Sequence, residues 1–274
     1  MNLSDTLILV RGGGDLATGV AHRLHRAGFT LMITELPQPL AVRRAVSFAE
    51  AVYAERVTVE GVTARRAPDP MVGMAYTVMG EIPVVVDLQD TTLARMRPPI
   101  VVDARVAKRN LGTRLTDAKL VLGLGPGFTA SADCHAVVET NRGHTLGRVY
   151  WEGSAEPNTG EPEPVRGFAG TRVLRAPREG MFAGQKQIGD AVKAGETLAR
   201  VDNEPIRAQF DGVVRGLLHD GLRVTAGMKV GDLDPRGVRE YCFLISEKAR
   251  AVGGGVLEAI FAGMRLWTPE DRRQ

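Results

Sequence analysis

The chain has 274 residues, of which 44% are hydrophobic and 24% charged, and its formal net charge is +3. This length supports two hydrophobic cores more naturally than one. Only 5% of the residues are aromatic and no run of lysines and arginines is dense, which excludes a nucleic-acid track. The two cysteines, Cys134 and Cys242, are too few for a disulfide framework, and no apolar run reaches membrane-spanning length. The composition therefore predicts a cytoplasmic protein with neither nucleic-acid nor membrane partners.

The first predicted element is a buried parallel strand over residues 7–10, LILV. It leads into RGGGDLATGVAHRLHRAGF, residues 11–29, which reproduces the glycine spacing of a dinucleotide-binding turn. In such a turn the first glycine bends the chain, the second admits a pyrophosphate, and a small third residue lets the helix pack closely. The candidate cofactor-binding residues here are Gly12, Gly14, Asp15 and Ala17.

A second strand is predicted from Phe29 to Thr34, and it ends at Glu35. An acidic residue about twenty positions after the glycines is placed to bind a ribose hydroxyl. The order strand, turn, helix, strand, acid favours a nucleotide, and the alternative is the same turn without one. A helix is expected from about Ala41, where Arg43 and Arg44 either meet an anion or lie on a solvated face.

Three further apolar strands are predicted within residues 82–88, 99–106 and 119–127. After the second of them come Asp103, Arg105, Lys108 and Arg109, which either bind an anion or form a solvated loop. Residues 1–151 are therefore interpreted as one α/β domain.

A second glycine-rich turn, Gly123, Gly125 and Gly127, ends the last of these strands and is a further candidate for cofactor binding. Open parallel sheets bind ligands at that edge. A helix is expected next, with Cys134 near its start. Such a position lowers a thiol pKa and suits a nucleophile or sulfur carrier, although a packed, inert cysteine is the alternative. His135 is the second candidate catalytic residue, Arg142 a candidate cofactor contact, and no metal set is recognised.

Residues 152–170 are rich in proline, glycine and glutamate and predict a linker. Beyond it, seven residues recur at an offset of 32 positions. Ala176, Gly180, Gly184, Gly189, Val192, Gly195 and Asp202 reappear as Ala208, Gly212, Gly216, Gly221, Val224, Gly227 and Asp234. Two short β halves that cannot bury their apolar faces alone are expected to form one module over residues 171–237.

This repeat resembles the barrel of biotinyl and lipoyl carrier domains, a barrel-sandwich hybrid. A carrier attaches its prosthetic group to a lysine on the hairpin that joins the two halves. The corresponding segment here, VDNEP at residues 201–205, contains no lysine. We therefore expect neither biotin nor lipoate, and a structural or docking role for the module.

Residues 238–274 are expected to form a helical segment that packs back on the first domain. Three adjacent glycines, Gly253, Gly254 and Gly255, interrupt its helical pattern. Because glycine inside a helix costs about 1 kcal/mol relative to alanine, close packing against a neighbour is favoured over a turn or an anion site.

Together, RGGGDLATGVAHRLHRAGF, TELPQPLAVRRAVSFAEAVY, GLGPGFTA, DCHAVVETNRGH and GVLEAIFAG resemble the YqeB family over nearly the whole chain. The resemblance implies an accessory factor in the maturation of a selenium-dependent molybdenum hydroxylase, with that client enzyme as partner. It also implies a nucleotide-bearing cofactor such as molybdopterin dinucleotide. The alternative is an NAD(P)-dependent oxidoreductase in which Glu35 holds the ribose and His135 donates a proton. A homo-oligomer is left open.

The predicted architecture is thus α/β: a Rossmann-like N-terminal domain, a biotinyl/lipoyl-like β-barrel module and a C-terminal helix.

Overall fold

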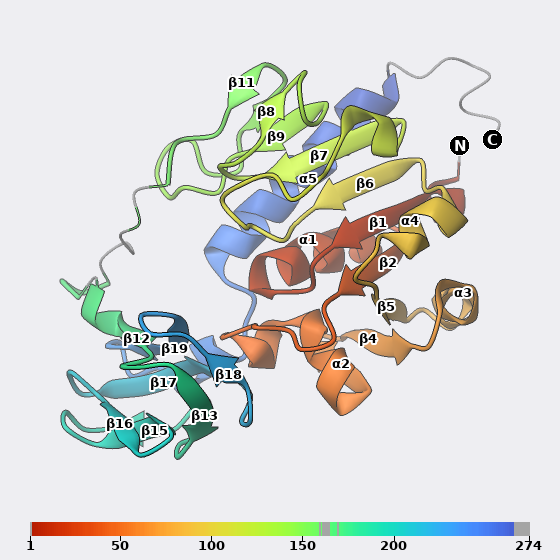
Figure 1. The fold of residues 1–274 in the computed structure, drawn as a ribbon. Coiled ribbons are helices and arrows are strands. Elements are labelled where there is room, and N and C mark those ends of the chain that lie inside the picture. Colours follow the sequence, from red (N-terminus) through yellow and green to blue (C-terminus); the bar gives the residue numbers. More distant parts are fainter. Residues whose placement is uncertain (1, 159, 161–164, 169, 266–274) are drawn as a thin grey trace. The chain divides into compact units, whose positions relative to one another are not determined.

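A computed structural model describes residues 2–158, 160, 165–168 and 170–265 (Figure 1). The chain divides into two compact units. The first comprises Met1–Pro39, Phe48–Asn158 and Ile245–Gln274, and the second comprises Leu40–Ser47 and Thr159–Leu244. The linker predicted over residues 152–170 falls partly on residues outside the described ranges. No helix in the described part of the chain is long and apolar enough to cross a bilayer.

The first unit is built on a nine-stranded sheet with the order β10-β9-β7-β6-β1-β2-β5-β4-β3. Its strands are β1 (Leu7–Arg11), β2 (Thr30–Glu35), β3 (Arg56–Val59), β4 (Val62–Ala67), β5 (Ile82–Val86), β6 (Ile100–Asp103), β7 (Leu120–Leu124), β9 (Ala136–Val138) and β10 (Val149–Tyr150). All neighbours pair in parallel except β3 with β4 and β10 with β9. A separate two-stranded sheet joins β8 (Thr129–Ala130) to β11 (Gly153–Ser154).

The strand order reverses beside β1. From β1 the chain forms β2, β3, β4 and β5 on one side, and it then returns to place β6 on the other side of β1. In open parallel sheets such a reversal leaves a crevice beyond the carboxyl ends of the strands, where ligands bind. The glycine turn follows β1 directly, so it lies at this reversal.

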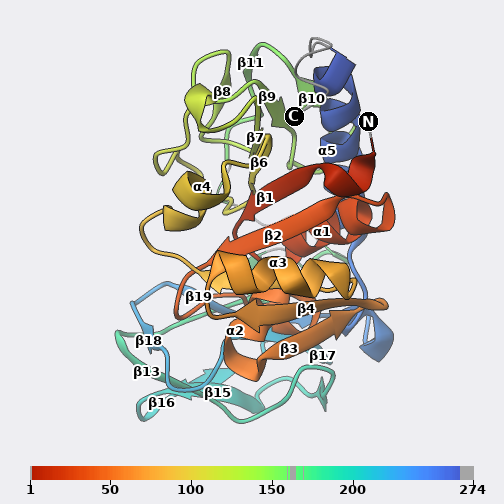
Figure 2. The same ribbon diagram turned by 90° about the vertical axis from the view of Figure 1, so that its right-hand side faces the viewer.

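Helices cover both faces of this sheet (Figures 1 and 2). On one face, Leu9, Met32, Val101 and Val121 form an apolar layer with side chains from α3 (Pro70–Val78) and α4 (Thr91–Met96). On the other, α1 (Asp15–Arg26) packs along α5 (Glu247–Arg265). Gly263 of α5 lies against Leu120, whose neighbour Val121 belongs to the first face.

The remaining helices are short. They are α2 (Ala51–Ala54) and the 3-10 turns Leu3–Asp5, Arg44–Val46, Phe48–Glu50, Leu115–Asp117, Gly170–Arg172 and Arg239–Cys242. The single helix expected from Ala41 is therefore wrong. Ser47 has an extended backbone, and the amides of Phe48 and Ala49 donate to the Thr18 hydroxyl and the Gly13 carbonyl, so a continuous helical hydrogen-bond series is broken there.

The three glycines near the C-terminus lie inside an unbroken α5. A Cβ on Gly253 would lie 2.8 Å from the Gly19 carbonyl oxygen of α1, and a Cβ on Gly255 would clash with the Gly147 carbonyl oxygen. Gly254 faces open space. Close packing therefore explains two of these glycines, as the sequence predicted.

The second unit contains two four-stranded antiparallel sheets. Their strands are β12 (Val173–Arg175), β13 (Gly180–Gly184), β14 (Ala191–Val192), β15 (Thr197–Val201), β16 (Glu204–Arg207), β17 (Gly212–Leu217), β18 (Arg223–Val224) and β19 (Lys229–Asp234). The sheet orders are β12-β19-β17-β14 and β16-β15-β13-β18. Shifting each strand of the first half by 32 residues reaches its counterpart and converts one order into the other. The sequence repeat is thus a repeat of topology, around a shared core that includes Phe182, Leu198 and Val214.

Candidate functional site

The turn after β1 uses its three glycines differently. Gly12 has φ +88°, and a Cβ there would lie 3.1 Å from the Cα of Arg105. A Cβ on Gly13 would lie 2.8 Å from the amide nitrogen of Ala49. Gly14 has an ordinary extended backbone, and within the described residues nothing lies within 4 Å of its Cβ position. The first two glycines serve packing, and Gly14 leaves open space at the start of α1.

Buried contacts hold the start of α1 in place. Ala17 is fully buried, and the Thr18 hydroxyl donates to the Gly13 carbonyl (3.2 Å) and accepts from the Phe48 amide (2.8 Å). Asp15 is the first helical residue. A helix start with its amides directed outward favours an anion.

Glu35, at the end of β2, contacts the same turn. Its carboxylate accepts from the Gly13 and Leu36 amides, each at 2.7 Å. Burial raises the pKa of Glu35, and these two hydrogen bonds oppose that rise. The side chain therefore braces the glycine turn, and its binding of a ribose hydroxyl stays a prediction.

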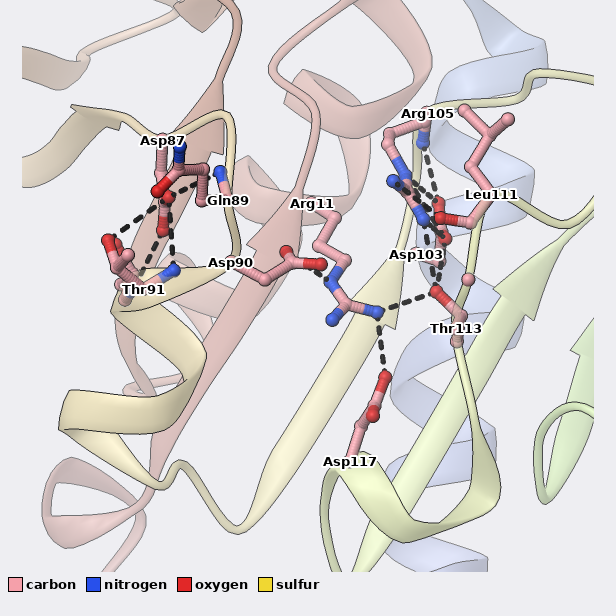
Figure 3. A network of polar contacts seen from close by, with 12 residues as sticks. Arg11, Asp87, Gln89, Asp90, Thr91, Asp103, Arg105, Leu111, Thr113 and Asp117 are labelled. Atoms are coloured by element: carbon pink, nitrogen blue, oxygen red, sulfur yellow. Dashed lines mark hydrogen bonds and ion pairs between the residues drawn. The ribbon is translucent and has the colours of Figure 1, made fainter.

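Arg11, the last residue of β1, is the centre of a polar network at the same edge (Figure 3). Its side chain is 2% exposed. Its Nη1 donates to the Thr113 hydroxyl (2.6 Å) and to the Asp117 carboxylate (2.8 Å), and its Nε lies 3.3 Å from Asp90. One guanidinium thus connects the end of β1 to the segments that follow β5 and precede β7.

Two further carboxylates lie at the carboxyl end of β6 and just after β5, and the first of them joins the Arg11 network through Thr113. Asp103, 1% exposed, pairs with Arg105 (2.5 Å) and accepts from the Thr113 hydroxyl (2.6 Å). Asp87, after β5, accepts from the amides of Gln89, Thr91 and Thr92 at the start of α4. Burial by itself would raise the pKa of Asp87, but these hydrogen bonds outweigh it and hold the pKa below its ordinary value.

The second glycine turn is filled by the protein itself. A Cβ on Gly123 would lie 2.5 Å from the Phe128 ring, and a Cβ on Gly125 would clash with the Thr140 hydroxyl. A Cβ on Gly127 would lie 2.5 Å from the Arg109 amide nitrogen. Their role in cofactor binding stays a prediction, and packing by itself explains the three glycines.

The predicted helix after this turn is wrong, and with it the reason to expect an ionised Cys134. The segment forms β8, a turn and β9 instead, because Ala136, Val137 and Val138 are all buried and pair with β7. Cys134 is fully buried in the apolar layer that α3 and α4 cover. Burial raises the pKa of its thiol to about 12.

His135 has a structural partner. Its Nδ1 accepts the Val121 amide hydrogen at 3.0 Å, and burial lowers its pKa. Val121 is the second residue of β7, whereas Gly125 follows the opposite end of that strand. Cys134 and His135 are therefore not brought together with the first glycine turn.

Arg142 pairs with Glu247 at the start of α5. Glu139 is fully buried and accepts from the amides of Thr140, Asn141 and Glu156. Arg43 and Arg44, assigned to the second unit, donate to carbonyl oxygens of Tyr241, Leu244 and Leu217. No group of histidine, cysteine and carboxylate side chains suited to a metal ion occurs in the described part of the chain.

Sequence reasoning missed Arg11, Asp90, Thr113 and Asp117. One signal was available, because Arg11 directly continues the apolar strand LILV, where a charged side chain must find buried partners. Its partners lie about 80 to 105 positions further along the chain, and no local pattern identifies them.

Fold and site together define a mixed α/β protein with a mostly parallel nine-stranded sheet and a polar network at its carboxyl edge. The chain is a homologue of the Escherichia coli K12 protein named "Uncharacterized protein YqeB", with 49% identity over 254 residues. The alignment covers 93% of this chain and 47% of the E. coli protein, so the chain spans about half the length of that relative. No family model matches.

Solved structures give only weak likenesses. An aspartoacylase family protein from Mesorhizobium loti aligns with a TM-score of 0.24 at 14% identity, covering 83% of this chain and 84% of that chain. A succinylglutamate desuccinylase/aspartoacylase from Rhodobacter sphaeroides aligns over the same shares with a TM-score of 0.25 at 15% identity. Scores this low support no argument about chemistry.

Proposed function

We propose that the first unit binds a nucleotide-bearing ligand at the carboxyl edge of its sheet, with a phosphate of the ligand at Gly14. The observation that carries this proposal is the open space at Gly14, at the start of α1 and beside the reversal of strand order. The order β5-β2-β1-β6-β7-β9 supports a Rossmann-like interpretation, in which a pyrophosphate lies at this helix start.

The ligand is one with a pyrophosphate and an unphosphorylated ribose. Glu35, at the end of β2, would repel a 2′-phosphate and accept hydrogen bonds from hydroxyl groups. Molybdopterin dinucleotide and NAD fit these requirements better than NADP.

The biological role is a maturation factor for a molybdenum hydroxylase, which rests on the sequence resemblance. In this role the first unit holds the pterin dinucleotide and the second unit, a biotinyl/lipoyl-like module without an attachment lysine, docks on the client enzyme. The oxidoreductase alternative gains no support from His135, because its Nδ1 is bonded to Val121 at the far end of β7.

Calorimetric titration with NAD, NADP and molybdopterin cytosine dinucleotide tests the proposal. We expect saturable binding, weakest for NADP, and loss of binding in Gly14→Val with no loss of thermal stability, because a Cβ at this position has no described protein atom within 4 Å. Gly254→Val is the matched control, since its Cβ also meets open space but lies in α5. Unchanged affinity in Gly14→Val, or no binding of any of the three, would remove the proposal.

A further inference from the structure

Arg11 has more hydrogen-bond donors than the protein satisfies. A guanidinium carries five N–H donors. Nη1 accounts for two hydrogen bonds, whereas Nε has no hydrogen-bond partner and only an ion pair with Asp90 at 3.3 Å. This Nε is buried, in a side chain that is 2% exposed. Buried donors are nearly always bonded, so this donor points to a group that the protein does not supply.

The position of this donor places it at the candidate ligand site. Side chains two residues apart on a strand point to the same face, so Arg11 lies on the face of Leu9, which α3 and α4 cover. Gly14 opens the helix α1, which covers the other face. A ligand that crosses the sheet edge beside β1 would therefore meet Gly14 at one side and Arg11 at the other.

The two carboxylates around Arg11 differ in how firmly they are held. Asp117 is 12% exposed, and its Oδ2 also accepts the Arg114 amide. Asp90 is 47% exposed and has a left-handed backbone, φ 54°. Asp90 is the more exposed of the two carboxylates, and its contact with Nε is an ion pair without a hydrogen bond, so Asp90 is the partner that an incoming anion can replace.

We propose that Arg11 is an oxyanion subsite, which binds a phosphate or carboxylate on the part of the ligand that crosses the sheet edge, in exchange for Asp90. This inference rests on the proposed function, because that proposal puts the ligand at Gly14 and across the sheet edge beside β1. It adds that the ligand carries an anionic group besides the phosphate at Gly14, and that Asp90 occupies the subsite until that group arrives.

Neutralising Asp90 tests the exchange directly. Inorganic phosphate and acetate are titrated against the full chain at constant ionic strength, with the thermal midpoint as the readout. In Asp90→Asn we expect about tenfold tighter binding of the preferred anion, because a competing negative charge next to Arg11 is gone. Misfolding cannot produce such a gain. Glu258→Gln, an exposed change of the same charge on α5, is the control and should leave the affinity unchanged.

Arg11→Gln is the converse test. In this variant we expect that added anion no longer raises the thermal unfolding midpoint. If phosphate responds and acetate does not, the group is a phosphate, and the reverse result assigns a carboxylate. No gain for either anion in Asp90→Asn, or an equal gain in Glu258→Gln, overturns the inference. Dinucleotide binding that Gly14→Val abolishes and Asp90→Asn leaves unchanged would retain the proposed function and reject only the subsite.

Discussion

Cys134 and Gly14 illustrate how the surroundings of a single residue decide its role. Both were candidates on local sequence. Cys134 is fully buried with its pKa raised to about 12, whereas the Cβ position of Gly14 faces open space among the described residues. Cys134 lies between β8 and β9, so no helix N-terminus is there to lower its thiol pKa. Gly14 directly precedes the helix α1, as predicted.

We predict that iodoacetamide modifies neither Cys134 nor Cys242 near neutral pH until the protein unfolds, since both are buried and burial raises both pKa values. Mass spectrometry of the native and denatured protein measures this. Rapid native labelling of Cys134 would show that its burial does not persist in solution.

The same thiol should make stability depend on pH in the alkaline range. Its pKa is about 12 in the folded protein against 9.0 for an unperturbed thiol, so above pH 9 the unfolded chain releases the proton first and is stabilised. The unfolding free energy of the wild type should therefore fall relative to that of Cys134→Ala as pH rises from 9 towards 12. Denaturant titrations of both proteins across this range measure the difference, and parallel curves would refute it.

At the scale of elements, the three adjacent glycines of α5 have different surroundings, so substituting each of them tests the packing of this helix. Gly254→Ala should raise the unfolding free energy by about 0.5–1 kcal/mol, because alanine is the better helix former and its Cβ meets no atom. Gly253→Ala and Gly255→Ala should lower it by about 1–3 kcal/mol, since their Cβ atoms press on carbonyl oxygens of Gly19 and Gly147. Urea unfolding of the three variants checks the order, and a uniform gain would contradict the packing argument.

Element prediction succeeded where the local pattern and the tertiary environment agreed. In residues 7–26 the apolar run, the glycine turn and the helical spacing each predict the element that the structure has, β1, a turn and α1. It failed for the helix expected after the second glycine turn, where β9 pairs with β7 and β8 pairs with β11 instead. Helical spacing of a few side chains cannot compete with pairing to a buried strand.

At the scale of the whole molecule, the second unit is a duplicated β module whose hairpin between β15 and β16 contains no lysine. We predict that intact mass after expression shows neither biotin nor lipoate. The module's Lys186 and Lys193 are paired with Glu196 and Asp211. A biotinyl or lipoyl increment mapped to any lysine between residues 171 and 235 would contradict the prediction.

By itself, the sequence determined the glycine turn after the first strand, the 32-residue repeat and the need for close packing by the glycines of α5. These features depend on residue types a few positions apart, or on one segment compared with another. Only the tertiary structure decided that Arg11 is joined to Asp90 and Asp117, that Gly125 and Gly127 are filled, and that Cys134 is buried. Those outcomes depend on contacts between segments that no local pattern identifies: the partners of Arg11 meet at the carboxyl edge of the sheet, and Cys134 is covered by an apolar layer built from several strands and helices.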